Sequence, residues 1–281
     1  MYERGGALQK ALTVVGRTIP GTDAKTWFYL NMIYRPRRFG RNVVSSFYRM
    51  DHIYEVLNEF KQKYNGQYSI LEFGVADGYA FTKKLHATKY CRMSDRVQLH
   101  GFDTFEGLPE IDEAFDRPLI AGDQWEAGTY KGRYEDLQTY CEDRYDNFAL
   151  HRGLFEETLT DAFLETLLIH KPILIWIDCD LYSSTKSVFD RLVPYIPTGC
   201  VIYFDDIYYN FGSRFTGEMR AVHEINSGCF GEGVELVPDR ALTWDSNRIY
   251  RFVNLNALST HEYKNTRTDG LRFRGEDSPF P

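Results

Sequence analysis

The chain has 281 residues and a net charge of −7, because 40 Asp and Glu outnumber 33 Lys and Arg. Hydrophobic residues make up 43% and aromatic residues 16%, which supports a large core and excludes an intrinsically disordered chain. The acidic balance argues against a general nucleic-acid binder, since no excess of cations is left to neutralise phosphates. No apolar run reaches the roughly 18 residues of a membrane helix, and the N-terminus lacks the apolar region of a signal peptide.

The five cysteines are widely spread and include no C-x-x-C pair. This arrangement is typical of reduced thiols, and not of a disulfide framework or a zinc site. We therefore expect a cytoplasmic protein.

The apolar pattern changes along the chain. Residues 1–65 predict helices and turns, with helical periodicity over 48–64. Further on, strand-length apolar runs alternate with helical stretches. The predicted strands are 69–75, 97–102, 147–152, 173–178, 200–205, 234–237 and 248–255, and the predicted helices lie near 79–90, 133–146, 156–169, 184–193 and 216–226.

This alternation predicts an α/β fold with a mostly parallel sheet covered by helices on both faces. The gap between the last two strands is too short for a crossover helix, so they should form an antiparallel pair at one edge. We divide the chain into an N-terminal helical or lid segment (1–65), a main domain (66–256) and a C-terminal tail (257–281).

The first strand ends in the turn EFGVADG, whose small residues Gly74, Ala76 and Gly78 allow the backbone to approach a ligand. The spacing is neither the dinucleotide fingerprint G-x-G-x-x-G nor a Walker A loop. A tight turn that needs glycine for geometry alone is an equally good interpretation.

The second strand ends at Asp103, in GFDTFEGLPE. An acid at this point can accept hydrogen bonds from both hydroxyls of a ribose. The alternative is a helix cap or an Asx turn. Glu72, at the end of the adjacent first strand, favours the nucleoside interpretation.

Four carboxylates follow the two strongest strands: Asp178, Asp180, Asp205 and Asp206. No run of Lys or Arg lies nearby in sequence, and leaving these acids unpaired and partly desolvated would be costly. Oxygen ligands of this kind suit Mg²⁺. The structural alternative is that Ser183, Ser184 and Asp206 cap helices.

Taken together, these motifs resemble those of the macrocin O-methyltransferase family. The segments EFGVADG, GFDTFEGLPE, RGLFEETL, IDCDLYSST and FDDIY carry the resemblance, which covers roughly residues 45–255. It implies a Rossmann-like class I methyltransferase fold, a seven-stranded sheet with an antiparallel last strand, and S-adenosylmethionine and Mg²⁺ as cofactors. One departure is Thr198-Gly199 where the family often has Gly-Gly.

The resemblance also implies roles for individual residues. Asp178, Asp205 and Asp206 would bind the metal, and Asp180 would be the base that takes the proton of the acceptor hydroxyl. Asp103 would hold the ribose. The other implied cofactor residues are Glu72, Phe73, Gly74, Ala76, Gly78, Thr104, Phe105, Glu106, Gly107, Gly153 and Phe155.

The expected function is O-methylation of a hydroxyl on a sugar or other secondary metabolite, in antibiotic or other natural-product biosynthesis. The alternatives are a catechol-type O-methyltransferase, a nucleoside-binding protein without catalysis, and an NAD-dependent oxidoreductase, which the missing G-x-G-x-x-G opposes. We expect a small-molecule acceptor as partner, no nucleic acid and no membrane, with a homo-oligomer left open. Arg220 and His223 are possible acceptor contacts, although a helix-surface position fits them better.

Overall fold

The computed structural model describes residues 51–111, 115–119, 126–239, 242 and 248–264, with a few N-terminal positions (11, 14–15, 18–19, 24 and 27–28). Most of the segment 1–65 and of the tail 257–281 lies outside these residues. The division of the chain into three parts therefore stays a prediction.

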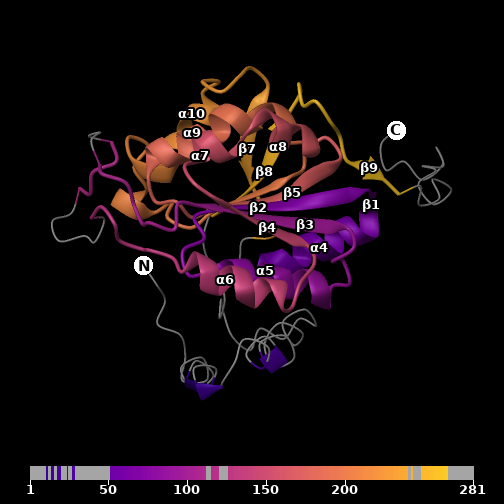
Figure 1. Cartoon of the computed structure of the whole chain (residues 1–281). Coiled ribbons are helices and arrows are strands. Elements are labelled where there is room, and N and C mark those ends of the chain that lie inside the picture. Colours follow the sequence, from indigo (N-terminus) through magenta and orange to yellow (C-terminus); the bar gives the residue numbers. More distant parts are fainter. Residues whose placement is uncertain are drawn as a thin grey trace, which may run out of the picture.

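The core of the fold is a seven-stranded sheet (Figure 1). Its strands, in the order β4-β3-β2-β5-β6-β8-β7, are β4 (Phe148–Arg152), β3 (Val97–Asp103), β2 (Gln67–Phe73), β5 (His170–Ile177), β6 (Val201–Phe204), β8 (Ile249–Asn254) and β7 (Val234–Pro238). Strands β2 to β6 pair in parallel, whereas β8 is antiparallel to both β6 and β7. The predicted parallel sheet and antiparallel edge pair are confirmed.

Helices cover both faces of this sheet, as predicted (Figure 1). One face carries α4 (Asp51–Lys63), α5 (Tyr79–Tyr90) and α6 (Tyr134–Glu142), and the other carries α7 (Phe155–Thr158), α8 (Asp161–Thr166), α9 (Tyr182–Leu192) and α10 (Gly217–Asn226). The short 3₁₀ helices η2 (Val193–Tyr195) and η3 (Tyr209–Gly212) and a two-residue pair of β1 (Tyr64–Asn65) with β9 (Glu262–Tyr263) complete the described elements.

The helix predicted over 156–169 is two short helices, α7 and α8. Thr160 interrupts it, because this residue has an extended backbone and its side chain accepts a hydrogen bond from Phe163 N at 3.2 Å. That bond is an N-cap, and it starts a new helix where apolar periodicity alone indicated continuity.

The central strands are buried on both faces, which explains their unbroken apolar runs. Every residue of β6 is buried, as are the last six residues of β5. The side chains that point to one face join a core with α4, α5 and α6, and those of the opposite face join a second core with α8, α9 and α10. None of the described helices combines the length and apolar character needed to cross a bilayer.

Candidate active site

A cavity of about 980 Å³ lies beyond the carboxyl ends of β2, β3, β5 and β6. Parallel open sheets bind ligands at this edge. The predicted cofactor residues on its wall are Glu72, Gly74, Ala76, Asp103, Thr104, Gly107, Gly153 and Phe155, and the four strand-end aspartates also line it.

Four predicted cofactor residues are not on the cavity wall. The Phe73 and Phe105 side chains are buried in the two cores, where Phe73 stacks on Phe102 and Phe105 packs edge-on against Tyr134. A Cβ at Gly78 would lie 2.3 Å from the Leu137 side chain, so this glycine allows α5 to pack against α6. Glu106 is exposed and pairs with Arg152.

Gly74 brings the ends of β2 and β5 together. Its φ is +87°, and a Cβ there would lie 1.8 Å from the carbonyl oxygen of Asp178. Only glycine permits this approach. It places the turn after β2 directly beside the first of the strand-end aspartates.

Asp103 ties the glycine turn to the end of β3. Its Oδ2 accepts hydrogen bonds from Val75 N at 2.7 Å and Ala76 N at 2.8 Å, and its Oδ1 accepts one from Phe105 N at 2.6 Å. A carboxylate offers about four acceptor positions, so part of this capacity is used inside the protein. Asp103 therefore shapes the turn, whatever it contributes to a ribose.

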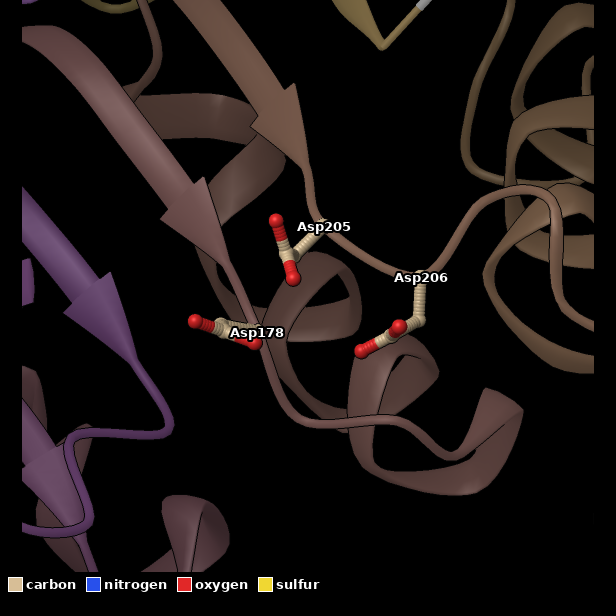
Figure 2. A group of neighbouring side chains, drawn as sticks. All are labelled: Asp178, Asp205 and Asp206. Atoms are coloured by element: carbon tan, nitrogen blue, oxygen red, sulfur yellow. The ribbon is translucent and has the colours of Figure 1, made fainter. Parts of the chain in front are cut away.

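Three aspartates converge beyond β5 and β6 (Figure 2). Asp178, Asp205 and Asp206 each offer a carboxylate oxygen, and these atoms lie within 4.8 Å of one another. All three side chains are half-buried. The donor set is oxygen only, which is the set that Mg²⁺ prefers.

The electrostatics of this cluster also fit a cation. Burial raises the pKa of Asp178 well above its usual range, and the nearby Asp205 and Asp206 carboxylates raise it further. Burial, followed by repulsion from Asp206 and a hydrogen bond with it, raises the pKa of Asp180 to about 9. Such shifts are expected where a positive charge completes the site.

Glu218, from the first turn of α10, adds a further buried acid. Its Oε2 accepts a hydrogen bond from Asp206 N at 2.9 Å, while its buried Oε1 has no hydrogen-bond partner. Burial raises the pKa of Glu218 well above its usual range. The orphaned oxygen is a second observation that fits a cation-binding region.

No basic partner for these acids is apparent from the sequence, but the structure supplies two. Arg248 Nη1 lies 3.5 Å from Asp205 Oδ1, and the Lys84 ammonium is attracted to Asp178 and Asp205 from beneath the site. Lys84 is fully buried and pairs with Glu72 at 2.8 Å. Both cations come from distant parts of the chain, so no local run of basic residues announces them.

Lys84 and Glu72 form a fully buried ion pair, with no exposure of either side chain. Burial lowers the pKa of Lys84 and raises that of Glu72, while their mutual attraction opposes both shifts. The remaining oxygen of Glu72, Oε1, has no partner within the protein. Glu72 is one of the residues that line the cavity.

Asp116 caps α9 from outside that helix. It is 3% exposed, and its Oδ1 accepts hydrogen bonds from Tyr182 N at 2.6 Å and Ser183 N at 3.2 Å. Neither Ser183 nor Ser184 caps α9, since the N-cap residue is Leu181 and it makes no side-chain cap bond. This contact joins the segment 115–119 to the turn that carries Asp180.

We expect Asp116→Ala to lower stability by about 1–2 kcal/mol, because two helix N–H groups lose a buried acceptor. The melting temperature should then fall by roughly 2–4 °C per kcal/mol in a chain of this size. Thermal unfolding followed by circular dichroism measures the shift. The exposed Asp143→Ala, at the end of α6, is the matched control; equal melting temperatures for the two variants would show that the cap is not needed.

Arg220 and His223 do not reach the cavity wall. Arg220 is paired with Glu224 at 2.8 Å and stacks between the rings of Phe115 and Tyr182, and His223 is exposed on α10. The helix-surface interpretation fits both residues. The wall does contain Tyr209, an aromatic residue that the sequence offered as a possible pocket wall. It also contains residues that were not expected there: Tyr79, Tyr130, Leu154, Glu156, Glu157 and Ser187.

Comparison with known proteins gives one family and a set of similar folds. The sequence model of the macrocin-O-methyltransferase (TylF) family matches residues 35–230. The calicheamicin methyltransferase CalS11 is 21% identical, covering 88% of this chain and 91% of its own, with a TM-score of 0.53. The O-methyltransferase NovP is 19% identical, covering 73% and 79%, with a TM-score of 0.50.

At these identities the two structures establish the class I methyltransferase fold and nothing finer. No curated protein sequence matches this chain. The assignment of activity therefore depends on the family match and on the site itself.

Proposed function

This chain belongs to the macrocin-O-methyltransferase family, and from that premise we propose that it moves a methyl group from S-adenosylmethionine to a sugar hydroxyl. The proposed acceptor is a glycosylated or otherwise hydroxylated secondary metabolite in natural-product biosynthesis. The enzyme is an O-methyltransferase by family; the donor, the cation and the acceptor class are the proposal.

The observation that carries the proposal is a single cavity that combines three features. It contains the glycine turn with Asp103, the three converging aspartates, and Asp180 beside them. Its volume of about 980 Å³ is at the upper end of small-molecule sites, typically about 300–1,000 Å³, so a donor and an acceptor have room side by side.

The acids and the glycine turn support different halves of the reaction. Methyl transfer from a sulfonium is an in-line displacement, in which the protein supplies proximity and alignment. The turn after β2 and Asp103 would hold the donor. When bound by Asp178, Asp205 and Asp206, Mg²⁺ would supply a positive charge that orients and acidifies the acceptor hydroxyl. Asp180 would accept the proton.

Features of the site oppose two of the three alternative functions. A nucleoside-binding protein without catalysis has no use for four acids gathered beyond β5 and β6. An NAD-dependent oxidoreductase would need the phosphate-binding glycine pattern, which the turn at 72–78 lacks. A catechol-type enzyme would use a similar set of acids with an aromatic diol, and only acceptor assays separate it from the proposed function.

Two measurements test the proposal. Calorimetry should show binding of S-adenosylmethionine and none of NAD. Transfer of labelled methyl groups should then occur with glycosylated acceptors that carry free sugar hydroxyls, and not with simple catechols. Methylation of catechols alone would replace the proposed acceptor class, and binding of NAD in place of S-adenosylmethionine would contradict the proposal as a whole.

We propose the cytoplasm as the place of action. The five cysteines are all free thiols and four of them are buried, which fits a reducing compartment.

Asp103→Ala should weaken S-adenosylmethionine binding by about ten- to hundredfold, because the glycine turn loses the carboxylate that holds it and the ribose loses an acceptor. Calorimetry measures the dissociation constant. Asp95→Ala, in an exposed turn before β3, is the control and should bind as the parent does. Unchanged affinity in a folded Asp103→Ala variant would remove this residue from the cofactor site.

A further inference from the structure

We propose that Trp176 and Tyr203 are positioning residues that orient two of the cation-binding carboxylates from the layer beneath the site. This inference rests on the proposed function, in that Asp178 and Asp205 must hold a divalent cation. It goes beyond that function by assigning a role to two buried aromatic residues, which do not themselves line the cavity.

The two aromatic residues occupy equivalent positions on neighbouring strands. Trp176 and Tyr203 are paired across β5 and β6, and each lies two residues before an aspartate. Residues two apart on a strand project to the same face. Each aromatic side chain is therefore on the same side of the sheet as the carboxylate that follows it.

Both polar tips are directed at these carboxylates. Trp176 Nε1 donates a hydrogen bond to Asp178 Oδ2 at 3.3 Å, and the Tyr203 hydroxyl donates to Asp205 Oδ1 at 2.6 Å. Each bond engages one oxygen of its carboxylate. The second oxygen and the remaining lone pairs are then presented toward the shared space between the three aspartates.

Packing fixes the two donors in place. The Trp176 and Tyr203 rings stack with centroids 3.8 Å apart, and each ring is only 2% exposed. His52 from α4 stacks on both rings, at 5.3 Å from Trp176 and 4.8 Å from Tyr203. On the side of α5, Lys84 Nζ lies 3.8 Å from the Trp176 ring centroid.

His52 adds no competing charge to this stack. Burial, with a smaller contribution from the Lys84 ammonium, lowers the pKa of His52 to about 3. The imidazole is therefore neutral at physiological pH and packs against both rings without a charge of its own. Donors held in this way keep a carboxylate in one rotamer before the cation arrives, which lowers the cost of binding.

A simpler account is that the two donors satisfy their own hydrogen-bonding needs within a core. The two accounts differ in what removal of a donor changes. A purely structural donor affects the melting temperature alone. A positioning donor changes the affinity for the cation and leaves the affinity for S-adenosylmethionine unchanged.

The test is Tyr203→Phe and Trp176→Phe in the full chain. Calorimetry with Mg²⁺ and electron paramagnetic resonance with Mn²⁺ measure cation binding without any acceptor. We expect each variant to bind both cations about 10- to 100-fold more weakly than the parent. Methyl transfer by each variant should require a higher Mg²⁺ concentration than in the parent. At saturating Mg²⁺ its kcat should be near the parent value.

Tyr250→Phe is the matched control. Tyr250 is also a buried tyrosine, on β8, but it belongs to the core on the opposite face of the sheet. Loss of the Tyr250 hydroxyl should leave the affinity for the cation at the parent value. If one test variant does not fold, the other decides alone, since each addresses a different carboxylate.

The outcomes separate this inference from the proposed function. Parent-like cation affinity in Tyr203→Phe and Trp176→Phe, together with a lower melting temperature, overturns the positioning role and leaves the proposed function standing. A parent protein that binds neither Mg²⁺ nor Mn²⁺ overturns both. Weaker cation binding with unchanged S-adenosylmethionine binding supports both.

Discussion

Asp180→Asn should lose most of kcat, by about 10²–10⁴-fold, while the fold and the binding of S-adenosylmethionine and Mg²⁺ remain. Asparagine keeps the size of the side chain and cannot accept the proton of the acceptor hydroxyl. Single-turnover measurement of methyl transfer gives the rate of the chemical step, and calorimetry checks both ligands.

The backbone at Asp180 supports a functional position. Its φ is +62°, in the left-handed region that aspartate seldom adopts, and Leu181 N donates to Cys179 O at 2.6 Å across the turn. Strained backbone of this kind persists where the surroundings hold it, and it is concentrated at active sites. Here it turns the chain from the end of β5 into α9 and keeps Asp180 on the cavity wall beside Asp178.

The structure removes the main structural alternative for this residue. From the sequence, Asp180 can also be interpreted as the cap of the following helix. The N–H groups at the start of α9 instead donate to Asp116, which comes from a distant segment. Loss of activity in Asp180→Asn therefore cannot be attributed to loss of that cap.

The pH dependence follows from the environment of Asp180. With a pKa raised to about 9 in the absence of a cation, the carboxyl holds its proton at neutral pH. A positive charge on the neighbouring aspartates would remove the repulsion and lower this pKa, so that Asp180 becomes a base. Raising the pH should partly rescue Asp180→Asn, because the acceptor hydroxyl then loses its proton more readily.

Asp190→Asn is the control for this variant. Asp190 lies on α9 as well, is exposed, and pairs with Lys186. It should keep the parent rate. If Asp180→Asn also turns over within about threefold of the parent, with methyl transfer rate-limiting, another group is the base. His223 would be the next candidate base from the sequence, but it is exposed on α10 and does not line the cavity, so the other acids of the wall would be tested instead.

The sequence predicted the sheet well because its signals are local. The unbroken apolar runs at 173–178 and 200–205 mark strands buried on both faces, and the structure has β5 and β6 there. The gathering of Asp178, Asp205 and Asp206 also followed from the sequence, since parallel strands end at one edge of a sheet.

The partners of these residues could not be predicted in the same way. Lys84 lies on a helix whose weak periodicity gives no reason to bury a lysine, and Asp116 meets Tyr182 across 66 residues of chain. Such contacts depend on tertiary packing. A local signal did exist for the donors beneath the site, since β5 and β6 each carry an aromatic residue two positions before an aspartate. From the sequence, Trp176 belonged to a buried apolar run and Tyr203 was a candidate for the wall of a substrate pocket, and neither was expected to position a carboxylate.

Removal of divalent cations should abolish turnover, and Mg²⁺ should restore it. The reason is that Asp178, Asp205 and Asp206 repel one another across less than 4.8 Å unless a positive charge lies between them. Activity is measured after exhaustive treatment with a chelator and again after titration with Mg²⁺. Full activity of the demetallated enzyme in excess chelator would exclude a catalytic cation.

Removal of one carboxylate ligand should weaken the binding of the cation and leave the binding of S-adenosylmethionine unchanged. We expect Asp178→Asn and Asp205→Asn to weaken Mg²⁺ binding by more than about 100-fold, since they remove groups that bind the cation directly. S-adenosylmethionine should bind nearly as it does to the parent. Asp161→Asn, exposed at the start of α8, is the matched control.

Protons should compete with the cation for this site, which gives the prediction a second, independent readout. Because burial raises the pKa values of Asp178 and Glu218 and the pKa of Asp180 is raised to about 9, the cation-free site holds at least the Asp180 proton at neutral pH. Binding of Mg²⁺ must release bound protons, so its affinity should rise with pH between about 6 and 9. Calorimetry in buffers of different ionisation enthalpy counts the released protons. An affinity that does not change over this range would mean that these carboxyls do not form the cation site.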